Sequence, residues 1–207
     1  MRRLCLFGGS FDPVHTGHLH LVAAALGRGG QGEVVVLPAA DPPHKRGRLE
    51  APAAARLEMA RIAFAHLDRV RVSDREIERG GISYTVETVR AFREGLEEEA
   101  ELAWLIGSDS LPELPDWREI HRLLALCRIL TVPRPGWPLA LSPALEAFFD
   151  AGEAAALRAG FLPVTPLPVS STELRRRLAA GEDPGDRIPT AVARYIREQG
   201  LYGEGGA

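Results

Sequence analysis

The chain has few cysteines, a single lysine, no asparagine and no long apolar run among its 207 residues. Cys5 and Cys127 each lie in a separate apolar stretch, so they predict buried thiols and argue against a disulfide or metal framework. No window approaches eighteen uninterrupted apolar residues, so we expect no membrane span. The apolar run before Gly8 is too short for a signal peptide, and we therefore expect a cytoplasmic protein.

An excess of basic charge is also lacking. The chain has 25 basic and 28 acidic residues and a net charge of −3 at pH 7. This balance predicts no general surface for nucleic acid or for an anionic membrane, so any anion must be bound by locally placed groups. Arginine replaces lysine everywhere except at Lys45, a pattern that biased codon usage explains. The retained lysine is a candidate phosphate contact, shared with His44, because a guanidinium cannot replace a compact ammonium at every site.

Hydrophobic residues make up 45% of the chain and charged residues 26%, as in ordinary globular proteins. Short apolar segments alternate with segments of helical periodicity. Strands are predicted over residues 3–7, 33–37, 70–72, 102–106 and 128–132. Helices are predicted over residues 19–26, 52–67, 84–98, 116–126 and 142–158. The alternation predicts an α/β fold in which helices cover both faces of a mainly parallel sheet.

The C-terminal part, about residues 170–203, is predicted to form two helices appended to the sheet. Ser170 and Glu173 have the spacing of a capping box at the first helix, and Gly200 ends the second. The chain shows no internal repeat, low-complexity tract or clear linker. We therefore expect a single domain over residues 1–207 with a helical C-terminal extension.

Unusual residues recur where the predicted strands end. They fall in residues 8–18, 38–45 and 107–109, and at Arg134. Ligands of parallel sheets bind beyond the carboxyl ends of the strands, so these segments predict a common site. In this position Asp109 is a candidate acceptor for ribose hydroxyls, and Gly107 beside it would give a nucleotide access to backbone groups.

The segment "GGSFDPVHTGHLHL" places Gly8 and Gly9 at the end of the first strand. Adjacent glycines permit either a tight turn with positive φ or the close approach of a phosphate to the next helix N-terminus. The dinucleotide fingerprint G-x-G-x-x-G is absent, which disfavours a hydride-transfer enzyme of the usual kind.

Three histidines follow in the same segment. His15 and His18 are three residues apart, so both can face one anion at the start of the helix. A metal site that includes His20 is the competing interpretation. It lacks a carboxylate or thiolate at ligand spacing, because Asp12 belongs to an Asp-Pro turn, and His20 would point away from His18 on a helix.

Two motifs at opposite ends of the chain carry a resemblance. "GGSFDPVHTGHL" resembles the H-x-G-H signature of the nucleotidyltransferase superfamily, and "SSTELR" resembles its second motif. Within that superfamily the chain resembles the bacterial nicotinate-nucleotide adenylyltransferases through "PPHK", "SYTVET", "IGSDSL", Trp117, "RPG" and "YIREQGLY". The resemblance implies a Rossmann-like, doubly wound sheet of five to six strands. It also implies transfer of the adenylyl group of ATP to nicotinate mononucleotide in NAD biosynthesis, with release of pyrophosphate.

The resemblance also implies roles for individual residues. Catalytic residues would be His15, His18, Lys45 and Arg175. ATP would contact Gly8, Gly9, Ser10, His15, His18, Gly107, Asp109, Ser171, Thr172 and Arg175. The mononucleotide would contact Ser10, Phe11, His44, Lys45, Thr85, Trp117 and Arg134. Mg²⁺ would arrive on the ATP phosphates, with no metal cage supplied by the protein.

Several alternatives stay open on the sequence alone. The acceptor could be nicotinamide mononucleotide or phosphopantetheine, although the phosphopantetheine enzymes usually have threonine where His15 stands. A cytidylyltransferase would lack the "SYT" segment and Trp117. A nucleotide sensor without catalysis would be expected to lack His18 or Arg175, and both are present. The oligomeric state is open, and a homo-oligomer is one alternative.

Overall fold

The computed structural model of the chain describes residues 2–43 and 49–203. Five strands form one sheet: β1 (Arg3–Gly9), β2 (Glu33–Pro38), β3 (Val70–Val72), β4 (Glu101–Gly107) and β5 (Arg128–Val132). Their order is β3-β2-β1-β4-β5, and each neighbouring pair is parallel. In the register of β1, Leu6 lies opposite Val35 of β2 and Trp104 of β4.

Helices connect the strands and follow the last one. They are α1 (Thr16–Leu26), α2 (Ala53–Phe64), α3 (Arg75–Arg79), α4 (Thr85–Arg93), the 3-10 helix η2 (Ser108–Asp116), α5 (Ile120–Leu126), α6 (Pro143–Phe148), α7 (Ala151–Ala159), α8 (Ser171–Ala179), the 3-10 helix η3 (Gly185–Arg187) and α9 (Thr190–Glu198). None of the helices in these two described ranges is long and apolar enough to cross a membrane.

The predicted helices differ in extent from the observed ones. The prediction 19–26 misses the first turn of α1, and the predictions 52–67 and 84–98 run past the ends of α2 at Phe64 and α4 at Arg93. The predicted helix 116–126 is interrupted, because Trp117 has an extended backbone and Glu119 has a left-handed φ of 52°, and together they separate η2 from α5. The predicted helix 142–158 is two helices. The side chain of Asp150 accepts the N–H of the third residue of α7 and so starts a new helix.

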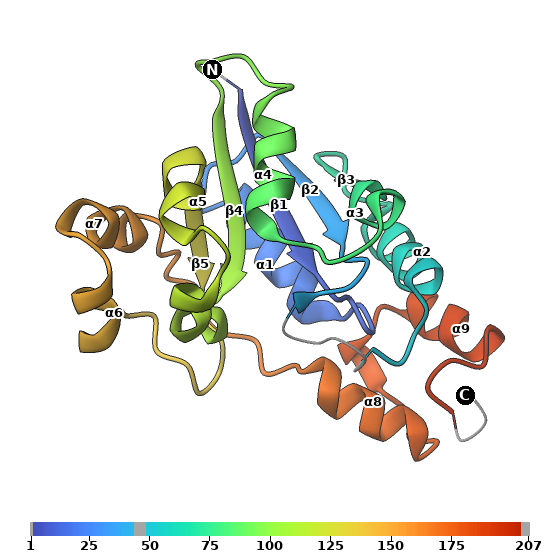
Figure 1. Cartoon of the computed structure of the whole chain (residues 1–207). Helices are drawn as coiled ribbons and strands as arrows, with labels where there is room; N and C mark the ends of the chain where they lie inside the picture. The colour runs from blue at the N-terminus through green and yellow to red at the C-terminus, as the bar shows by residue number, and fades with distance from the viewer. Residues whose placement is uncertain (1, 44–48, 204–207) are drawn as a thin grey trace.

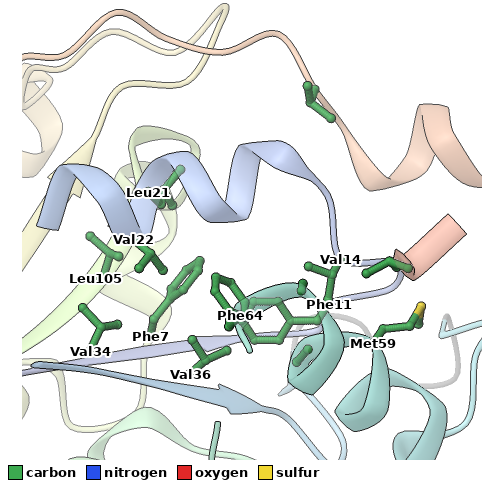
Figure 2. Close-up of a cluster of buried hydrophobic side chains, with 14 of the residues drawn as sticks. Phe7, Phe11, Val14, Leu21, Val22, Val34, Val36, Met59, Phe64 and Leu105 are labelled. Atoms are coloured by element: carbon green, nitrogen blue, oxygen red, sulfur yellow. The ribbon is translucent and has the colours of Figure 1, made fainter. Parts of the chain in front are cut away.

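The sheet buries both of its faces, because alternate residues of each strand point to opposite sides. On β1, Cys5 and Phe7 belong to a cluster with α1, α2, α8 and α9, and Figure 2 shows Phe7, Phe11 and Phe64 packed together there. Leu6 belongs to a second cluster with α4, α5 and α7. Parallel order with helices on both faces confirms the predicted α/β fold, a Rossmann-like doubly wound sheet, with five strands.

The C-terminal helices pack against the first of these clusters. Leu174 of α8 and Ile196 of α9 are buried there together with the strand side chains. The capping box predicted from the spacing of Ser170 and Glu173 is wrong: Ser170 makes no side-chain capping bond among the described residues, and Glu173 pairs with Arg176 at 2.8 Å. Apolar packing therefore contributes to the attachment of these helices to the sheet.

Candidate active site

A cleft opens where the order of the strands reverses, between the carboxyl ends of β1 and β4. Its volume is about 590 Å³. The arrowheads of β2 and β4 point toward the end of the molecule where α8 lies (Figure 1). Every predicted site residue that falls within the described ranges lines this cleft: Gly8, Gly9, Ser10, Phe11, His15, His18, Thr85, Gly107, Asp109, Trp117, Arg134, Ser171, Thr172 and Arg175.

The glycines that end β1 serve close packing. Neither Gly8 nor Gly9 has a positive φ; the left-handed residue of this turn is Phe11, with φ 52°. A Cβ on Gly8 would overlap the indole of Trp104 on the neighbouring strand. The positive-φ explanation for these two glycines is therefore wrong, and the absence of a side chain at Gly8 leaves room for the Trp104 indole on this face of the sheet.

The two histidines of the H-x-G-H motif lie together at the start of α1. His15 is the N-cap residue, is 1% exposed, and stacks on His18 with 3.8 Å between ring centroids. The backbone N–H of His15 donates to Nδ1 of His18 at 3.1 Å. A neutral His18 therefore carries its proton on Nε2, where it is a hydrogen-bond donor. Phe11 packs on the His18 ring at 4.9 Å and helps to fix its orientation.

The second motif lies beside the first although more than 150 residues separate them. Arg175 donates from Nη1 to the carbonyl of Asp12 at 2.8 Å and from Nε to the carboxylate of Glu50 at 2.8 Å. Ser171, the first residue of α8, donates from its hydroxyl to the carbonyl of Pro13 at 3.3 Å. A guanidinium and a helix N-terminus thus flank the turn that carries the two histidines.

Arg134 and Asp109 come from the ends of β5 and β4. Their side chains are 3.8 Å apart, from Nε to Oδ1. The backbone N–H of Arg134 donates to the buried hydroxyl of Ser108 at 2.8 Å, and that hydroxyl donates to the carbonyl of Trp137 at 2.9 Å. Ser108 therefore holds the loop of Arg134 against the end of β4, a role the sequence analysis did not assign.

Aromatic and polar groups occupy another part of the cleft wall. Thr85 begins α4, and Tyr84 is its N-cap residue. Arg118 lies over the Tyr84 ring at 4.6 Å and pairs with Glu87 at 3.3 Å. Trp117 presents an indole whose buried Nε1 has no hydrogen-bond partner within residues 2–43 and 49–203. This wall offers a flat apolar ring next to a helix N-terminus.

A buried carboxyl behind this wall escaped the sequence analysis. Glu76 of α3 is 3% exposed, lines the cleft, and accepts a hydrogen bond from the Thr88 hydroxyl at 2.6 Å. Burial raises the pKa of Glu76, although hydrogen bonds from Thr88 and Ser83 oppose the effect. The segment "DREIERGG" is rich in charge and has the pattern of a solvated turn, so no local signal marks Glu76 as buried.

The described residues show no group of three His, Cys, Asp or Glu side chains that could hold a metal ion. His20 does not line the cleft. Lys45 and His44, predicted as phosphate contacts, lie outside the described residues. Cys5 and Cys127 are buried free thiols, as predicted, and burial raises the pKa of Cys127 to about 12.

Known proteins resemble this chain over nearly its whole length. The model of the cytidylyltransferase-like family matches residues 6–177. A protein named probable nicotinate-nucleotide adenylyltransferase from Bordetella avium is 40% identical over 203 residues, covering 98% of each chain. One of the same name from Neisseria meningitidis serogroup B is 43% identical over 206 residues, covering 98% of this chain and 99% of that one.

A solved structure has the same fold. The Plasmodium falciparum nicotinic acid mononucleotide adenylyltransferase complexed with NaAD superposes with a TM-score of 0.75 over 98% of each chain, at 19% identity. At that identity the superposition supports the fold, while the curated relatives and the family model support the assignment. The chain belongs to the nicotinate-nucleotide adenylyltransferases of the cytidylyltransferase-like family.

Proposed function

We propose that this chain transfers the adenylyl group of ATP to nicotinate mononucleotide, giving nicotinate adenine dinucleotide and pyrophosphate in NAD biosynthesis. The observation that carries the proposal is the convergence of two distant motifs on one cleft. His15, His18 and Arg175 lie in one part of its wall, and Trp117 and Thr85 lie in another. A cleft with anion-binding groups and a stacking surface suits a nucleoside triphosphate and an aromatic mononucleotide together.

The reaction needs positioning and charge neutralisation more than covalent catalysis. A phosphate oxygen of the mononucleotide attacks the α-phosphorus of ATP in line, and the bond to the β-phosphate oxygen breaks as pyrophosphate leaves. His18 donates from Nε2 to the α-phosphate, and His15 with the N-terminus of α1 supports the α- and β-phosphates. Negative charge that develops on the bridging oxygen is thereby stabilised without a proton transfer.

Arg175 binds the terminal phosphates of ATP in this proposal, together with Ser171 and Thr172 at the start of α8. Without nucleotide its Nε donates to the carboxylate of Glu50, which is half exposed. A phosphate replaces this carboxylate as the acceptor when ATP binds. The exchange keeps the guanidinium paired in both states.

The acceptor lies against the other wall. Trp117 stacks on the pyridine ring, and Thr85 with the N-terminus of α4 receives the nicotinate carboxylate, because a helix N-terminus favours an anion over a neutral amide. Arg134 binds the phosphate of the mononucleotide, with Ser10 and Phe11 beside it. Asp109 accepts hydrogen bonds from ribose hydroxyls of the ATP moiety.

Mg²⁺ would enter as the ion carried by the ATP phosphates, whose negative charge it would partly neutralise. The described residues offer the ion no protein cage. His44 and Lys45 are assigned to phosphate by sequence alone. The cytoplasmic location and the single domain over residues 1–207 stay predictions, and the oligomeric state stays open.

The test is purified protein with Mg-ATP and, in parallel, nicotinate mononucleotide, nicotinamide mononucleotide and phosphopantetheine, with pyrophosphate release and product mass as readouts. A mismatched buried hydrogen bond costs about 1–3 kcal/mol, so we expect the acid to be preferred over the amide about ten- to a hundredfold in kcat/KM. Equal efficiency with acid and amide would defeat the acid-specific assignment. ATP binding without turnover of any acceptor would favour the sensor alternative.

Two variants separate the contributions to acceptor choice. Trp117→Ala is expected to weaken both pyridine mononucleotides in similar proportion, because stacking does not depend on the charged group. Thr85→Val is expected to narrow the gap between acid and amide, because it removes a hydroxyl assigned to the carboxylate. An unchanged acid-to-amide ratio in Thr85→Val would remove Thr85 from the acceptor site.

A further inference from the structure

Asp12 lies in the turn between β1 and the two histidines, and its carboxylate binds segments that are far apart in the sequence. Asp12 is 1% exposed. Its Oδ2 accepts the backbone N–H of Glu50 at 3.0 Å, and its Oδ1 accepts the backbone N–H of Ala51 at 3.1 Å and the hydroxyl of Tyr202 at 2.7 Å. Three donors therefore hold this buried charge, one of them from the turn after α9.

A second buried group fixes the same turn. Arg56 of α2 is 1% exposed and donates to the carbonyls of Ser10 at 2.8 Å, Ala51 at 3.2 Å and Ala40 at 3.2 Å. Its positive charge compensates the negative charge of Asp12 in the protein interior. The guanidinium of Arg56 thus binds backbone carbonyls of the turn and of the segment before α2. The carboxylate of Asp12 binds backbone N–H groups of that same segment.

Both anchors of Arg175 depend on this carboxylate. The Nη1 of Arg175 donates to the carbonyl of Asp12, and its Nε donates to the side chain of Glu50. Asp12 binds the backbone N–H of Glu50 with its own carboxylate. A displacement of the Asp12 side chain would therefore move both acceptors of Arg175 before ATP binds, and it would still move the carbonyl acceptor once a phosphate has replaced Glu50.

Tyr202 is the donor to Asp12 that comes from the C-terminal end of the chain. It is 8% exposed and follows α9 in a turn with φ 64°. Burial and the charge of Asp12 raise the pKa of the Tyr202 hydroxyl, so it stays a protonated donor at neutral pH. In Figure 1 α9 lies near α2, at the edge of the molecule that also carries α8.

We propose that Tyr202 is a positioning residue for adenylyl transfer: through Asp12 it fixes Arg175 at the phosphate end of the cleft. The inference rests on the proposed function, because that function assigns Arg175 to the terminal phosphates of ATP. A hydroxyl group at the C-terminal end of the chain thereby contributes to nucleotide binding without touching the nucleotide.

The experiment compares Tyr202→Phe with Tyr195→Phe, which removes the hydroxyl of a partly buried tyrosine on α9 that packs against the same core. Among the described residues Tyr195 makes no side-chain hydrogen bond, so it is a matched control. Each variant is made in the parent and in an Arg175→Ala background. Mg-ATP affinity is measured by calorimetry, and kcat and KM for ATP are measured with nicotinate mononucleotide.

A hydrogen bond to a charged buried group predicts a loss of about tenfold in ATP affinity and in kcat/KM for Tyr202→Phe. The ATP affinity and kcat/KM of Tyr195→Phe are expected to stay within about twofold of the parent, because this change removes a hydroxyl without a hydrogen-bond partner among the described residues. In the Arg175→Ala background the effect of Tyr202→Phe is expected to fall below about twofold, because the two residues act in series. If Tyr202 had only a structural role, Tyr202→Phe would lower the melting temperature, but its effect on ATP affinity would not depend on the presence of Arg175.

The proposal is overturned if Tyr202→Phe lowers ATP affinity equally with and without Arg175, or leaves it unchanged. If Tyr202→Phe does not fold, Tyr202→Met, whose flexible apolar side chain fills the site without a donor to Asp12, is used in the same cycle with the same criterion. Because calorimetry needs no acceptor, a parent that binds ATP but does not turn over nicotinate mononucleotide contradicts the proposed function and still tests this inference.

Discussion

Replacing Gly17 with alanine tests the arrangement of the two histidines directly. Gly17 is the second residue of α1, and a Cβ there would lie 2.9 Å from Cε1 and Nδ1 of His15. His15 is buried and stacked on His18, so its ring cannot move away without breaking that stack. We therefore expect Gly17→Ala to displace the catalytic imidazoles, although alanine is the better helix former.

The structure sets the expected magnitudes. Overpacking costs about 1–3 kcal/mol, and alanine regains up to about 1 kcal/mol of helix propensity, so the free energy of unfolding is expected to fall by about 0–2 kcal/mol. Displacing one preorganised donor to a developing charge lowers kcat by about 10²–10³. Activity is therefore expected to fall far more than stability.

The assay measures kcat by pyrophosphate release and stability by urea unfolding on the same preparation. The matched control is Gly152→Ala, at the second position of α7, where the new Cβ would lie 3.2 Å from the capping Oδ1 of Asp150 and away from the cleft. Because the neighbouring carboxylate is exposed and alanine is the better helix former, the control is expected to keep the stability of the parent or gain up to about 1 kcal/mol, and to leave kcat unchanged. A Gly17→Ala variant with the kcat of the parent would refute the assigned geometry of His15.

Three further predictions follow from the site. His18→Ala is expected to leave a folded protein and to lose on the order of 3 kcal/mol of transition-state stabilisation, about a hundredfold in kcat, and near-normal turnover would contradict the donor role. Lys45→Arg is expected to impair kcat or KM despite its conserved charge, and kinetics equal to the parent would make the lysine incidental. Burial raises the pKa of Glu76 from its ordinary value of 4.5, so the folded state retains a proton that the unfolded state has lost. The free energy of unfolding, measured with urea, should therefore decline as pH rises from 4.5 through the raised pKa. Glu76→Gln should remove that part of the decline, and parallel pH profiles of the parent and the variant would contradict the prediction.

The strands and the motifs were predictable from sequence because both depend on neighbours along the chain. Apolar runs that end at glycine located β1 and β4, and the three-residue spacing of His15 and His18 placed both rings at one helix start. The helix predicted over residues 116–126 was wrong because its interruption comes from the backbone conformation of individual residues. Glu119 with its positive φ divides a stretch whose composition favours one continuous helix.

The residues that the sequence could not reveal are polar groups whose burial depends on distant segments. Asp12 looks like an ordinary Asp-Pro turn until Ala51 and Tyr202 approach it, and Tyr202 looks like the last aromatic of a helical tail. Glu76 lies in a charged stretch and is buried against Thr88 of α4 and Ser83. No periodicity marks such positions, because their partners lie up to 190 residues away along the chain.

The sequence by itself determined the alternation of strands and helices, the anion-binding start of α1 and the family to which the chain belongs. The tertiary structure decided how these parts meet. Parallel order with a reversal between β1 and β4 brings Arg134, Asp109 and the histidines to one crevice. Packing of α8 against the first hydrophobic cluster buries Leu174, and Arg175, the next residue on the helix, then faces the cleft and reaches the carbonyl of Asp12.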